Sequence, residues 1–177
     1  LGRQLLLDDP DSGESTFTYD DLGRLVTASD ATGQTKTYFY DDFDRPIRID
    51  YSTTRDDPAD VTFHYDEAPS YMPKATNLTG RLSWVTDHTG TVFYSYDNRG
   101  RAEIVGRDLF GTVYLAHTTY DNLDRVVALT YPDQARVEYC YNKGGLLQEI
   151  PGYLDQIAYQ ADGQIEAMSY HNGLKHD

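Results

Sequence analysis

The sequence predicts an all-β fold, a repetitive meander of antiparallel β-hairpins, and three observations lead to this prediction. A Tyr-Asp dipeptide, followed at a fixed offset by a Gly-Arg or Asp-Arg pair, recurs along the chain. Alternating runs of β-branched and aromatic residues flank the copies, which is the pattern of strands. Turn-forming residues recur at about ten-residue spacing, as in a meandering sheet.

The repeated motif is written most fully at 19–25, as Tyr-Asp-Asp-Leu-Gly-Arg-Leu. One copy is split, because an insertion at 67–79 separates Tyr65-Asp66 from Gly80-Arg81. The motif tyrosines lie 21, 25, 31, 24, 21 and 18 residues apart, so the period is elastic. The chain therefore holds about seven or eight units of one repeat region, 1–177. The other complete copies are 40–46, 96–102 and 120–126, the degraded copies are 141–147 and 159–165, and 1–5 is the back half of one more.

Each unit is predicted to contain two strands joined by the motif turn. An Asp side chain can accept hydrogen bonds from backbone N–H groups two residues on, and Gly or Asp tolerates a positive φ, so Asp20 and Gly23 are turn formers. Second turns join one unit to the next, at 30–33, 87–90 and 132–134. The expected strands are 16–19, 25–28, 37–40, 47–51, 61–65, 92–96, 126–131 and 137–141.

In the first strand of each unit, the motif tyrosine and the residue two places before it share a face of the sheet. Stacked units would then form an aromatic ladder. The second strands do not divide into two faces, because Leu82 and Trp84 fall on one parity while Ile47 and Ile49 fall on the other. The paired residues are Phe17 with Tyr19, Tyr38 with Tyr40, Phe63 with Tyr65, Tyr94 with Tyr96, and Tyr139 with Tyr141.

An arginine follows each complete motif turn at a constant place. It lies close to the motif aspartate of its own unit or of a neighbouring one, which predicts a ladder of Arg–Asp pairs. Exposed pairs of this kind set register more than stability. The arginines are Arg24, Arg45, Arg81, Arg101 and Arg125.

The composition allows a folded core and excludes several partners. The 177 residues include 15 Lys+Arg and 29 Asp+Glu, a net charge of −14, and 39% are hydrophobic. Nucleic acids and anionic membrane surfaces are therefore poor partners. The chain has neither a run of about 18 apolar residues nor a signal peptide, so no membrane insertion by this segment is expected. Because it begins at Leu1, inside a repeat, we expect a piece of a longer protein whose export signal could lie elsewhere.

No catalytic residue, metal ligand set or cofactor site is expected. The carboxylate clusters at Asp8-Asp9-Asp11, Asp41-Asp42-Asp44 and Asp56-Asp57-Asp60 lack the pattern of a calcium loop, and turn capping is the favoured interpretation. Residues 106–112 have the glycine spacing of a phosphate loop without its lysine. The five histidines, His64, His88, His117, His171 and His176, are scattered. The only cysteine, Cys140, is interpreted as a small packed residue rather than a reactive thiol.

Two features could bind a partner. Trp84 and exposed tyrosines near Asp and Asn are side chains of the kind that hold sugars, although use of the tyrosines in the β-sheet core is the favoured reading. The insertion at 67–79 breaks the period, and loops that break a repeat often carry contacts. It could equally be a tolerated surface loop.

At 19–25, 40–46, 96–101 and 120–126 the motif resembles that of the RHS or YD-repeat family, which is named for its Tyr-Asp dipeptide. The resemblance covers nearly the whole chain and implies a long β-sheet that spirals into a hollow shell. In bacterial polymorphic toxins and insecticidal toxin complexes of this family the shell encloses a toxic C-terminal domain. In animal teneurins a related barrel belongs to a cell-adhesion receptor.

The resemblance implies a structural role for the motif residues. The chain lacks the Asp-Pro-x-Gly-Leu motif that ends the bacterial repeat core, and it contains no toxin domain after the repeats. It is therefore similar to a wall segment without its cargo. The residues with an implied structural role are Tyr19, Asp20, Gly23, Arg24, Tyr40, Asp41, Arg45, Tyr65, Asp66, Gly80, Arg81, Tyr96, Asp97, Gly100, Arg101, Tyr120, Asp121, Arg125, Tyr141 and Tyr159.

Three functional hypotheses follow. The first is a non-catalytic wall segment of a secreted or cell-surface bacterial protein, with the rest of the shell and an enclosed toxin polypeptide as partners. The second is an adhesion or carbohydrate-binding module that contacts glycans through Trp84. The third, an enzyme, has least support because the sequence offers repetition where catalysis needs one unlike site. Unpaired strands at the ends of the sheet also predict self-association.

Overall fold

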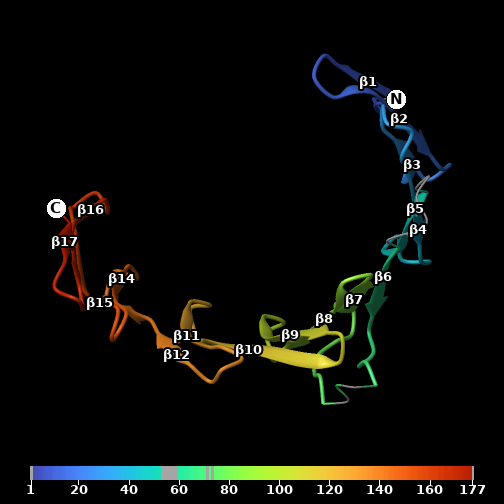
Figure 1. Cartoon of the computed structure of the whole chain (residues 1–177). Helices are drawn as coiled ribbons and strands as arrows, with labels where there is room; N and C mark the ends of the chain where they lie inside the picture. The colour runs from blue at the N-terminus through green and yellow to red at the C-terminus, as the bar shows by residue number, and fades with distance from the viewer. Residues whose placement is uncertain (1, 53–59, 71, 73, 177) are drawn as a thin grey trace. The chain divides into compact units, whose positions relative to one another are not determined.

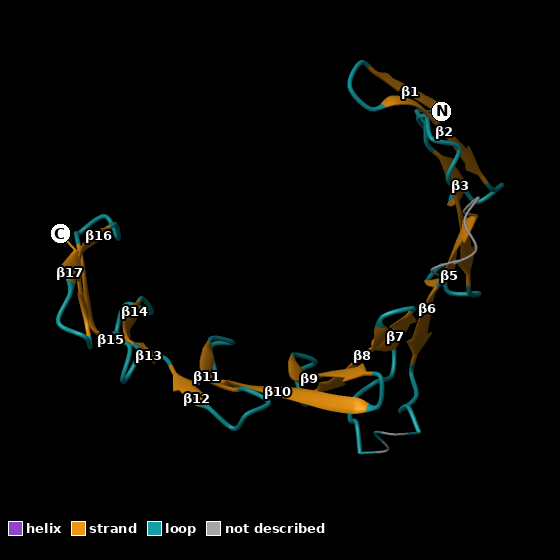
Figure 2. Ribbon diagram, in the orientation of Figure 1, coloured by secondary structure: helices purple, strands orange, loops and turns teal. Residues whose placement is uncertain are grey.

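The computed structural model describes residues 2–52, 60–70, 72 and 74–176, and these form 17 β-strands and no helix (Figure 1, Figure 2). The first twelve strands form one antiparallel sheet in which each strand lies beside its neighbours in the sequence. They are β1 (Leu6–Asp9), β2 (Gly13–Tyr19), β3 (Leu25–Ser29), β4 (Thr35–Tyr40), β5 (Pro46–Ser52), β6 (Val61–Tyr65), β7 (Leu82–Asp87), β8 (Gly90–Tyr96), β9 (Ala102–Leu109), β10 (Thr112–Tyr120), β11 (Val126–Thr130) and β12 (Arg136–Glu138).

Two smaller sheets follow in the sequence. They contain β13 (Cys140–Tyr141) with β14 (Leu147–Glu149), and β15 (Leu154–Tyr159) with β16 (Ile165–Tyr170) and β17 (Lys175–His176). By its internal contacts the chain divides into two compact units. The first contains residues 1–95 and 107–113, and the second contains 96–106 and 114–177.

The all-β meander predicted from the sequence is confirmed. The strands before the motif turns end at the motif tyrosines Tyr19, Tyr40, Tyr65, Tyr96 and Tyr120. One expected strand, 137–141, is divided at Tyr139. Before the division β12 pairs with β11, and after it β13 pairs with β14, so the two halves belong to different sheets.

A β-bulge follows the motif turn, and sequence reasoning did not anticipate it. In the first hairpin Thr18 pairs with Thr27 and Tyr19 pairs with Leu25, so Val26 is an extra residue. A bulge of this kind reverses the alternation of faces along its strand. The bulge therefore explains why the second strands could not be divided into two faces by parity. The corresponding extra residues in other hairpins are Ile47, Ser83, Val127, Gln148 and Glu166.

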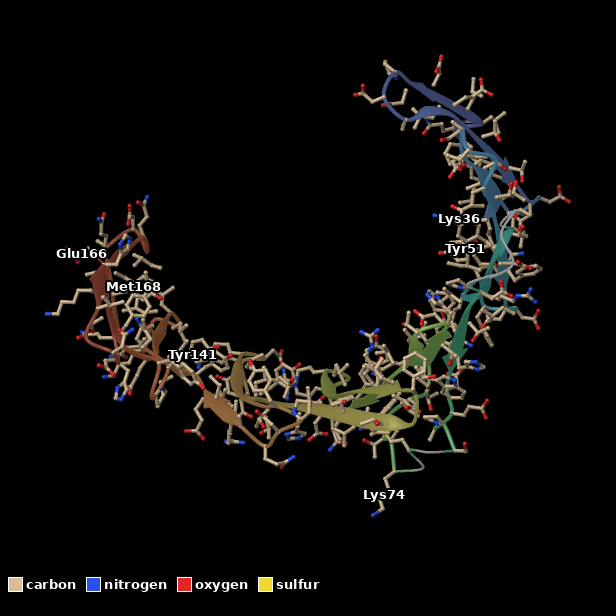
Figure 3. The ribbon with its side chains drawn as sticks, viewed as in Figure 1. Lys36, Tyr51, Lys74, Tyr141, Glu166 and Met168 are labelled. Atoms are coloured by element: carbon tan, nitrogen blue, oxygen red, sulfur yellow. The ribbon has the colours of Figure 1, made fainter. Side chains whose placement is uncertain are left out.

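With the bulge included, the tyrosines and their neighbours define one face of the sheet, here called the tyrosine face. In the first unit Phe17, Ala28 and Lys36 lie opposite one another in a row across β2, β3 and β4. Lys36 lies 5.5 Å from the ring centre of Tyr51, and Figure 3 shows both side chains on the same side of the ribbon. The other face carries hydroxyl pairs, such as Thr18 with Thr27 at 2.6 Å.

The insertion at 67–79 covers the face of β8 opposite the tyrosine face. The Thr76 N–H donates to Ser95 Oγ at 3.0 Å, and Ser95 is buried. Leu78 from the insertion and Phe93 from β8 are also buried. Residues 71 and 73, which belong to the expected loop, lie outside the described residues. The described part of the insertion thus supplies the second layer of a small local core.

In the second unit Ala128 of β11 and Leu154 and Ile157 of β15 are buried. The interpretation of Cys140 as a packed residue is wrong, because its side chain is exposed. Cys140 begins β13 and pairs with Glu149, while the neighbouring Tyr141 is half-buried. Since side chains alternate along a strand, Cys140 points to solvent.

The local core contains one unsatisfied hydroxyl, and this gives a first prediction. Ser83 is completely buried and its Oγ has no hydrogen-bond partner among the described residues. Replacing Ser83→Ala removes a desolvated polar atom, so the melting temperature should stay unchanged or rise. The matched variant Ser95→Ala breaks the bond from Thr76 and should cost about 1–3 kcal/mol in the free energy of unfolding. A larger loss for Ser83→Ala than for Ser95→Ala would contradict this description of the core.

A second prediction concerns the close approach of Gly90 to the β9–β10 hairpin. A Cβ at Gly90 would lie 2.1 Å from the Asp108 carbonyl oxygen, whereas one at Gly33 would meet nothing within 4 Å. Both glycines have positive φ, 143° and 81°. Gly33→Ala should therefore cost only the conformational term, about 1–2 kcal/mol. Gly90→Ala should cost clearly more in chemical denaturation, and equal losses would exclude the steric contact.

Candidate functional site

The motif aspartate builds the turn with both its backbone and its side chain. The Asp20 N–H donates to the Arg24 carbonyl at 3.0 Å, and the Gly23 N–H donates to the Asp20 carbonyl at 2.9 Å. Asp20 Oδ1 accepts the Arg24 N–H at 2.8 Å. Asp41, Asp97 and Asp121 make the same side-chain bond to the N–H of Arg45, Arg101 and Arg125.

The fourth turn position has a positive φ in every complete copy. Gly23 and Gly100 adopt φ of 85° and 80°, while Asp44 and Asp124 adopt 62° and 64°. Aspartate tolerates this region at some cost. Here its carboxylate also makes a new contact, because Asp44 Oδ1 binds Arg24 Nη1 of the preceding repeat at 2.7 Å. Asp124 Oδ1 binds Arg101 Nη1 at 2.6 Å in the same way.

The motif arginine of each complete copy connects its own turn to the next repeat, and we call this set of contacts the joint. Arg101 Nε donates to Asp97 Oδ2 at 2.6 Å, and its Nη1 donates to the Asp121 carbonyl at 2.8 Å. Its guanidinium carbon lies 4.6 Å from the ring centre of Tyr120. Arg24 over Tyr40, Arg45 over Tyr65 and Arg125 over Tyr141 repeat this stacking at 4.9, 4.3 and 4.4 Å. The stacked guanidinium thus binds a carboxylate and an aromatic face at the same time.

The motif tyrosine completes the joint through its hydroxyl. Tyr40 Oη donates to the Leu25 carbonyl at 2.9 Å, and Leu25 is the residue directly before the bulged Val26. In each of these bonds the acceptor is a backbone carbonyl of the preceding unit. It belongs to the residue that directly follows the position of the motif arginine. The same bond joins Tyr19 to Gln4, Tyr65 to Pro46, Tyr120 to Ala102, Tyr141 to Val126, and Tyr159 to Leu147, at 2.6–3.0 Å.

The split copy is rejoined in space, with one change. The Asp66 N–H donates to the Arg81 carbonyl at 3.2 Å, and Asp66 Oδ1 accepts the Gly80 N–H at 2.5 Å. Asp66 Oδ2 binds Arg45 Nη2 of the preceding repeat at 2.9 Å. Arg81 Nη1 donates to the Asn77 carbonyl of the insertion at 2.9 Å. The insertion therefore keeps the turn and adds a contact between the motif arginine and the loop.

The degraded copies retain the turn without the ion pair. Asn142 Oδ1 accepts the N–H of Leu146, which stands where the other copies have arginine. In the last copy the Gln160 N–H donates to the Gln164 carbonyl at 2.8 Å. Tyr141 and Tyr159 still donate to the preceding unit, so the tyrosine contact persists where the aspartate and arginine do not.

These contacts lower the pKa of the motif carboxyls. For Asp20 the main cause is the hydrogen bond from the Arg24 side chain, which lowers its pKa below the ordinary value. For Asp97 desolvation is the largest single influence and acts to raise the pKa. The hydrogen bonds from the Arg101 backbone, the Arg101 side chain and the Arg99 backbone together outweigh it, so the pKa of Asp97 is lowered. The aspartates thus bind their partners as carboxylates.

The residues that the sequence raised as candidates for sugar, metal or phosphate binding lie outside this joint. Trp84 is half-buried, and its indole stacks on the His64 ring at a centroid distance of 4.2 Å, which occupies one face of the indole. Asp9 caps its turn by accepting the Ser12 N–H at 2.8 Å, whereas residues 56 and 57 lie outside the described residues. Among the described residues no group of three or more His, Cys, Asp or Glu side chains could hold a metal ion. Residues 106–112 form the β9–β10 hairpin.

The sequence predicted Arg–Asp pairs at the joint, but not which atoms the tyrosine hydroxyls and the guanidinium groups contact. The Arg–Asp pairs expected within and between repeats are present, for example Arg24 with Asp20 and Asp44. The acceptor of each tyrosine hydroxyl and the cation–π stacking were not anticipated. One sequence feature could have indicated the contact between repeats. Asp44 and Asp124 replace the glycine of the motif, and both bind the arginine of the preceding repeat.

Comparison with known proteins gives one family and one fold. The family described as Teneurin YD-shell matches residues 7–116. No curated protein matches the sequence. Within the described residues, no helix is long and apolar enough to cross a membrane.

Solved structures of toxin complexes have the same fold. The crystal structure of TcdB2-TccC3 matches with a TM-score of 0.85 at 17% identity, over 98% of this chain and 10% of that one. The Photorhabdus luminescens Tc holotoxin pore matches with a TM-score of 0.81 at 17% identity, over 97% and 10%. The TcdB2-TccC3-Cdc42 structure matches with a TM-score of 0.82 at 16% identity, over 97% and 10%. The chain thus spans about a tenth of the chains it matches.

The tyrosine contact gives a third prediction. Tyr120→Phe removes the bond to the Ala102 carbonyl while keeping the ring under Arg101, so it should lower the free energy of unfolding by about 0.5–1.5 kcal/mol. Tyr153→Phe is the control, because Tyr153 is exposed and donates no hydrogen bond through its hydroxyl in the described part of the chain. Urea titrations compare the two, and an equal effect would exclude a specific role for the Tyr120 hydroxyl.

The lowered carboxyl pKa values give a fourth prediction. A carboxyl whose pKa is lower in the folded state stabilises the fold above the unfolded value of about 4 and loses this effect as the pH falls through its folded pKa. The melting temperature should therefore fall on acidification below about pH 4. Asp97→Asn combined with Asp121→Asn should melt lower at neutral pH but lose less on acidification. Identical pH profiles for both proteins would contradict the assignment.

Proposed function

The chain belongs to the teneurin YD-shell family, and from this premise we propose that it is a non-catalytic wall segment of a shell that encloses and shields a polypeptide. The observation that carries the proposal is the joint between repeats. Within the described residues the same tyrosine bond is made by Tyr19, Tyr40, Tyr65, Tyr120, Tyr141 and Tyr159, and it holds their strand pairs to the preceding ones. A regular array of this kind builds a continuous surface. Catalysis instead needs a single group of residues that differs from the repeated ones.

The single-layer construction of the first unit also supports a wall. Among the described residues, those buried in this unit are Pro69 and Leu78 of the insertion and Ser83, Phe93 and Ser95 of β7 and β8. The tyrosine-face residues of β2 to β6, such as Phe17 and Tyr38, are only half-buried. A sheet normally buries an apolar face against a second layer. A wall segment leaves that face to the enclosed space, where it confines an unfolded polypeptide away from solvent and proteases.

The partners in this proposal are the remainder of the parent shell and an enclosed toxin polypeptide. Support comes from the toxin complexes whose fold the chain shares, of which it spans 10%. Residues 1–177 are then one YD-repeat region of a secreted or cell-surface bacterial protein. The outer strand β1 belongs at the junction with further wall, because it pairs on one side with β2 and its Leu6, like the preceding Leu5, is exposed.

A second candidate, a carbohydrate-binding module, is favoured by one observation. A hollow of about 250 Å³ on the tyrosine face is lined by Phe17, Ala28, Gln34, Lys36 and Tyr38. Aromatic rings beside amide and ammonium groups suit a sugar ring. This hollow, rather than the stacked Trp84, is the better place to test for glycans in this chain.

The wall proposal is tested by capture of an unfolded polypeptide. The purified chain is mixed with reduced, carboxamidomethylated ribonuclease and analysed by size-exclusion chromatography with light scattering. Because this alkylation adds no charge, native ribonuclease is the control for charge. We expect a β-rich species that retains the unfolded probe and not the native one. A monomer that ignores unfolded chains but binds a glycan through the hollow near Tyr38 would favour the second candidate instead.

A further inference from the structure

Large apolar side chains stand at the apexes of the motif turns. Leu22, Phe43 and Leu123 occupy the same place in three of the four complete copies, and they are 71%, 78% and 72% exposed. In the fourth copy the place is taken by Arg99, whose Nη1 donates to the Asn122 carbonyl at 2.9 Å. The ring centre of Phe43 lies 5.3 Å from the guanidinium carbon of Arg45 in its own turn, and the Phe43 side chain is nevertheless largely exposed.

The motif aspartate fixes these residues at the apex. Asp41 Oδ1 accepts the Phe43 N–H at 2.9 Å, and Asp121 Oδ1 accepts the Leu123 N–H at 2.8 Å. The next residue in each turn, Asp44 or Asp124, has a positive φ that turns the chain back. The backbone of the apex residue is thus fixed by the same carboxylate that accepts the arginine N–H of the turn.

In the first unit two apolar apexes lie along one edge of the sheet. Alternate turns of an antiparallel meander fall on the same edge, so the β2–β3 and β4–β5 turns lie together. The opposite edge between β1 and β5 carries polar residues, Asp11 and Thr32, in its turns. We call Leu22 and Phe43, with the flanking Asp21 and Asp42, the Leu22–Phe43 edge.

Two carboxylates of this edge are exposed and are not engaged in ion pairs with any described residue. Asp21 and Asp42 are exposed and make no ion pair among the described residues. Arg24 is already paired with Asp20 and Asp44, and Arg45 is paired with Asp41 and Asp66. Arg3 also lies at this edge, beside Gly23, and stacks over the Tyr19 ring at 5.6 Å. The carboxylates of the edge outnumber these guanidinium groups, so its net charge is negative. A second copy of the same edge would bring these carboxylates together, so the edge favours a basic partner.

The spacing of the two apexes selects the shape of that partner. Two turns that are two strands apart place their apexes about 9.6 Å from each other. Side chains on one face of an extended strand recur at about 6.8 or 13.6 Å, which does not match. Residues seven apart on an α-helix recur at about 10.5 Å on nearly the same face, which does.

We propose that the Leu22–Phe43 edge docks a basic amphipathic helix. Two apolar side chains of the helix, seven residues apart, pack on Leu22 and Phe43, and Lys or Arg residues beside them pair with Asp21 and Asp42. This surface goes beyond the wall function, because it lies on the turn edge and not on the tyrosine face.

The test uses a capped helical peptide of about 18 residues, built from Ala and Lys with two Leu residues seven apart, and binding is followed by fluorescence anisotropy. Leu22→Ser combined with Phe43→Ser should weaken binding about tenfold or more. Asp21→Asn with Asp42→Asn should weaken binding and flatten its dependence on salt. Leu115→Ser, which removes a 45% exposed leucine in the second unit, should change nothing.

A control peptide of the same composition carries its leucines nine residues apart, on opposite faces of the helix. It should bind weakly. The proposal is overturned if the wild-type chain does not bind the first peptide, if both peptides bind alike, or if the Leu22 and Phe43 variant binds as tightly as wild type. Circular dichroism melts check the variants' folding, and because the substituted side chains are exposed, melting should be unchanged.

Discussion

The guanidinium of the motif arginine is the group on which the rest of this sheet depends. Arg101 binds the aspartate of its own turn, the turn carbonyl of the next repeat and the ring of the next tyrosine. A single-layer sheet has little buried apolar area with which to fix one hairpin to another. Planar, multidentate polar contacts replace that area, and arginine can make them where lysine cannot. The carboxylates remain ionised because their hydrogen bonds outweigh desolvation.

The variations among the copies follow from this constraint. Where glycine gives way to aspartate at Asp44 and Asp124, the strained backbone is offset by a second carboxylate on the preceding arginine. Where the chain inserts 67–79, Arg81 donates to the Asn77 carbonyl of the loop, and the loop contributes Leu78 to a small buried core. Where arginine is lost, as at Leu146, the tyrosine hydroxyl of the next unit still holds the strands.

The repeated motif made the strands and turns of this fold predictable. Features that depend on how strands pair with one another could not be predicted. Strand ends and turns follow from local chemistry at residues such as Asp20 and Gly23, so they could be read directly. The bulge at Val26 could not, because it depends on how two strands pair and not on either strand alone. Missing it left the faces of the second strands unassigned. Cys140 was misplaced because alternation points a strand residue outward as readily as inward.

The account's central claim is that successive repeats are held by coupling between an arginine and the next tyrosine, which a double-mutant cycle on Arg101 and Tyr120 measures most directly. The variants are Arg101→Gln, Tyr120→Leu and both together, each unfolded in urea. The account predicts that the double variant loses clearly less stability than the sum of the two single variants, because each single change already breaks the shared contact. Strict additivity would mean that the two side chains act independently, and it would contradict the claim.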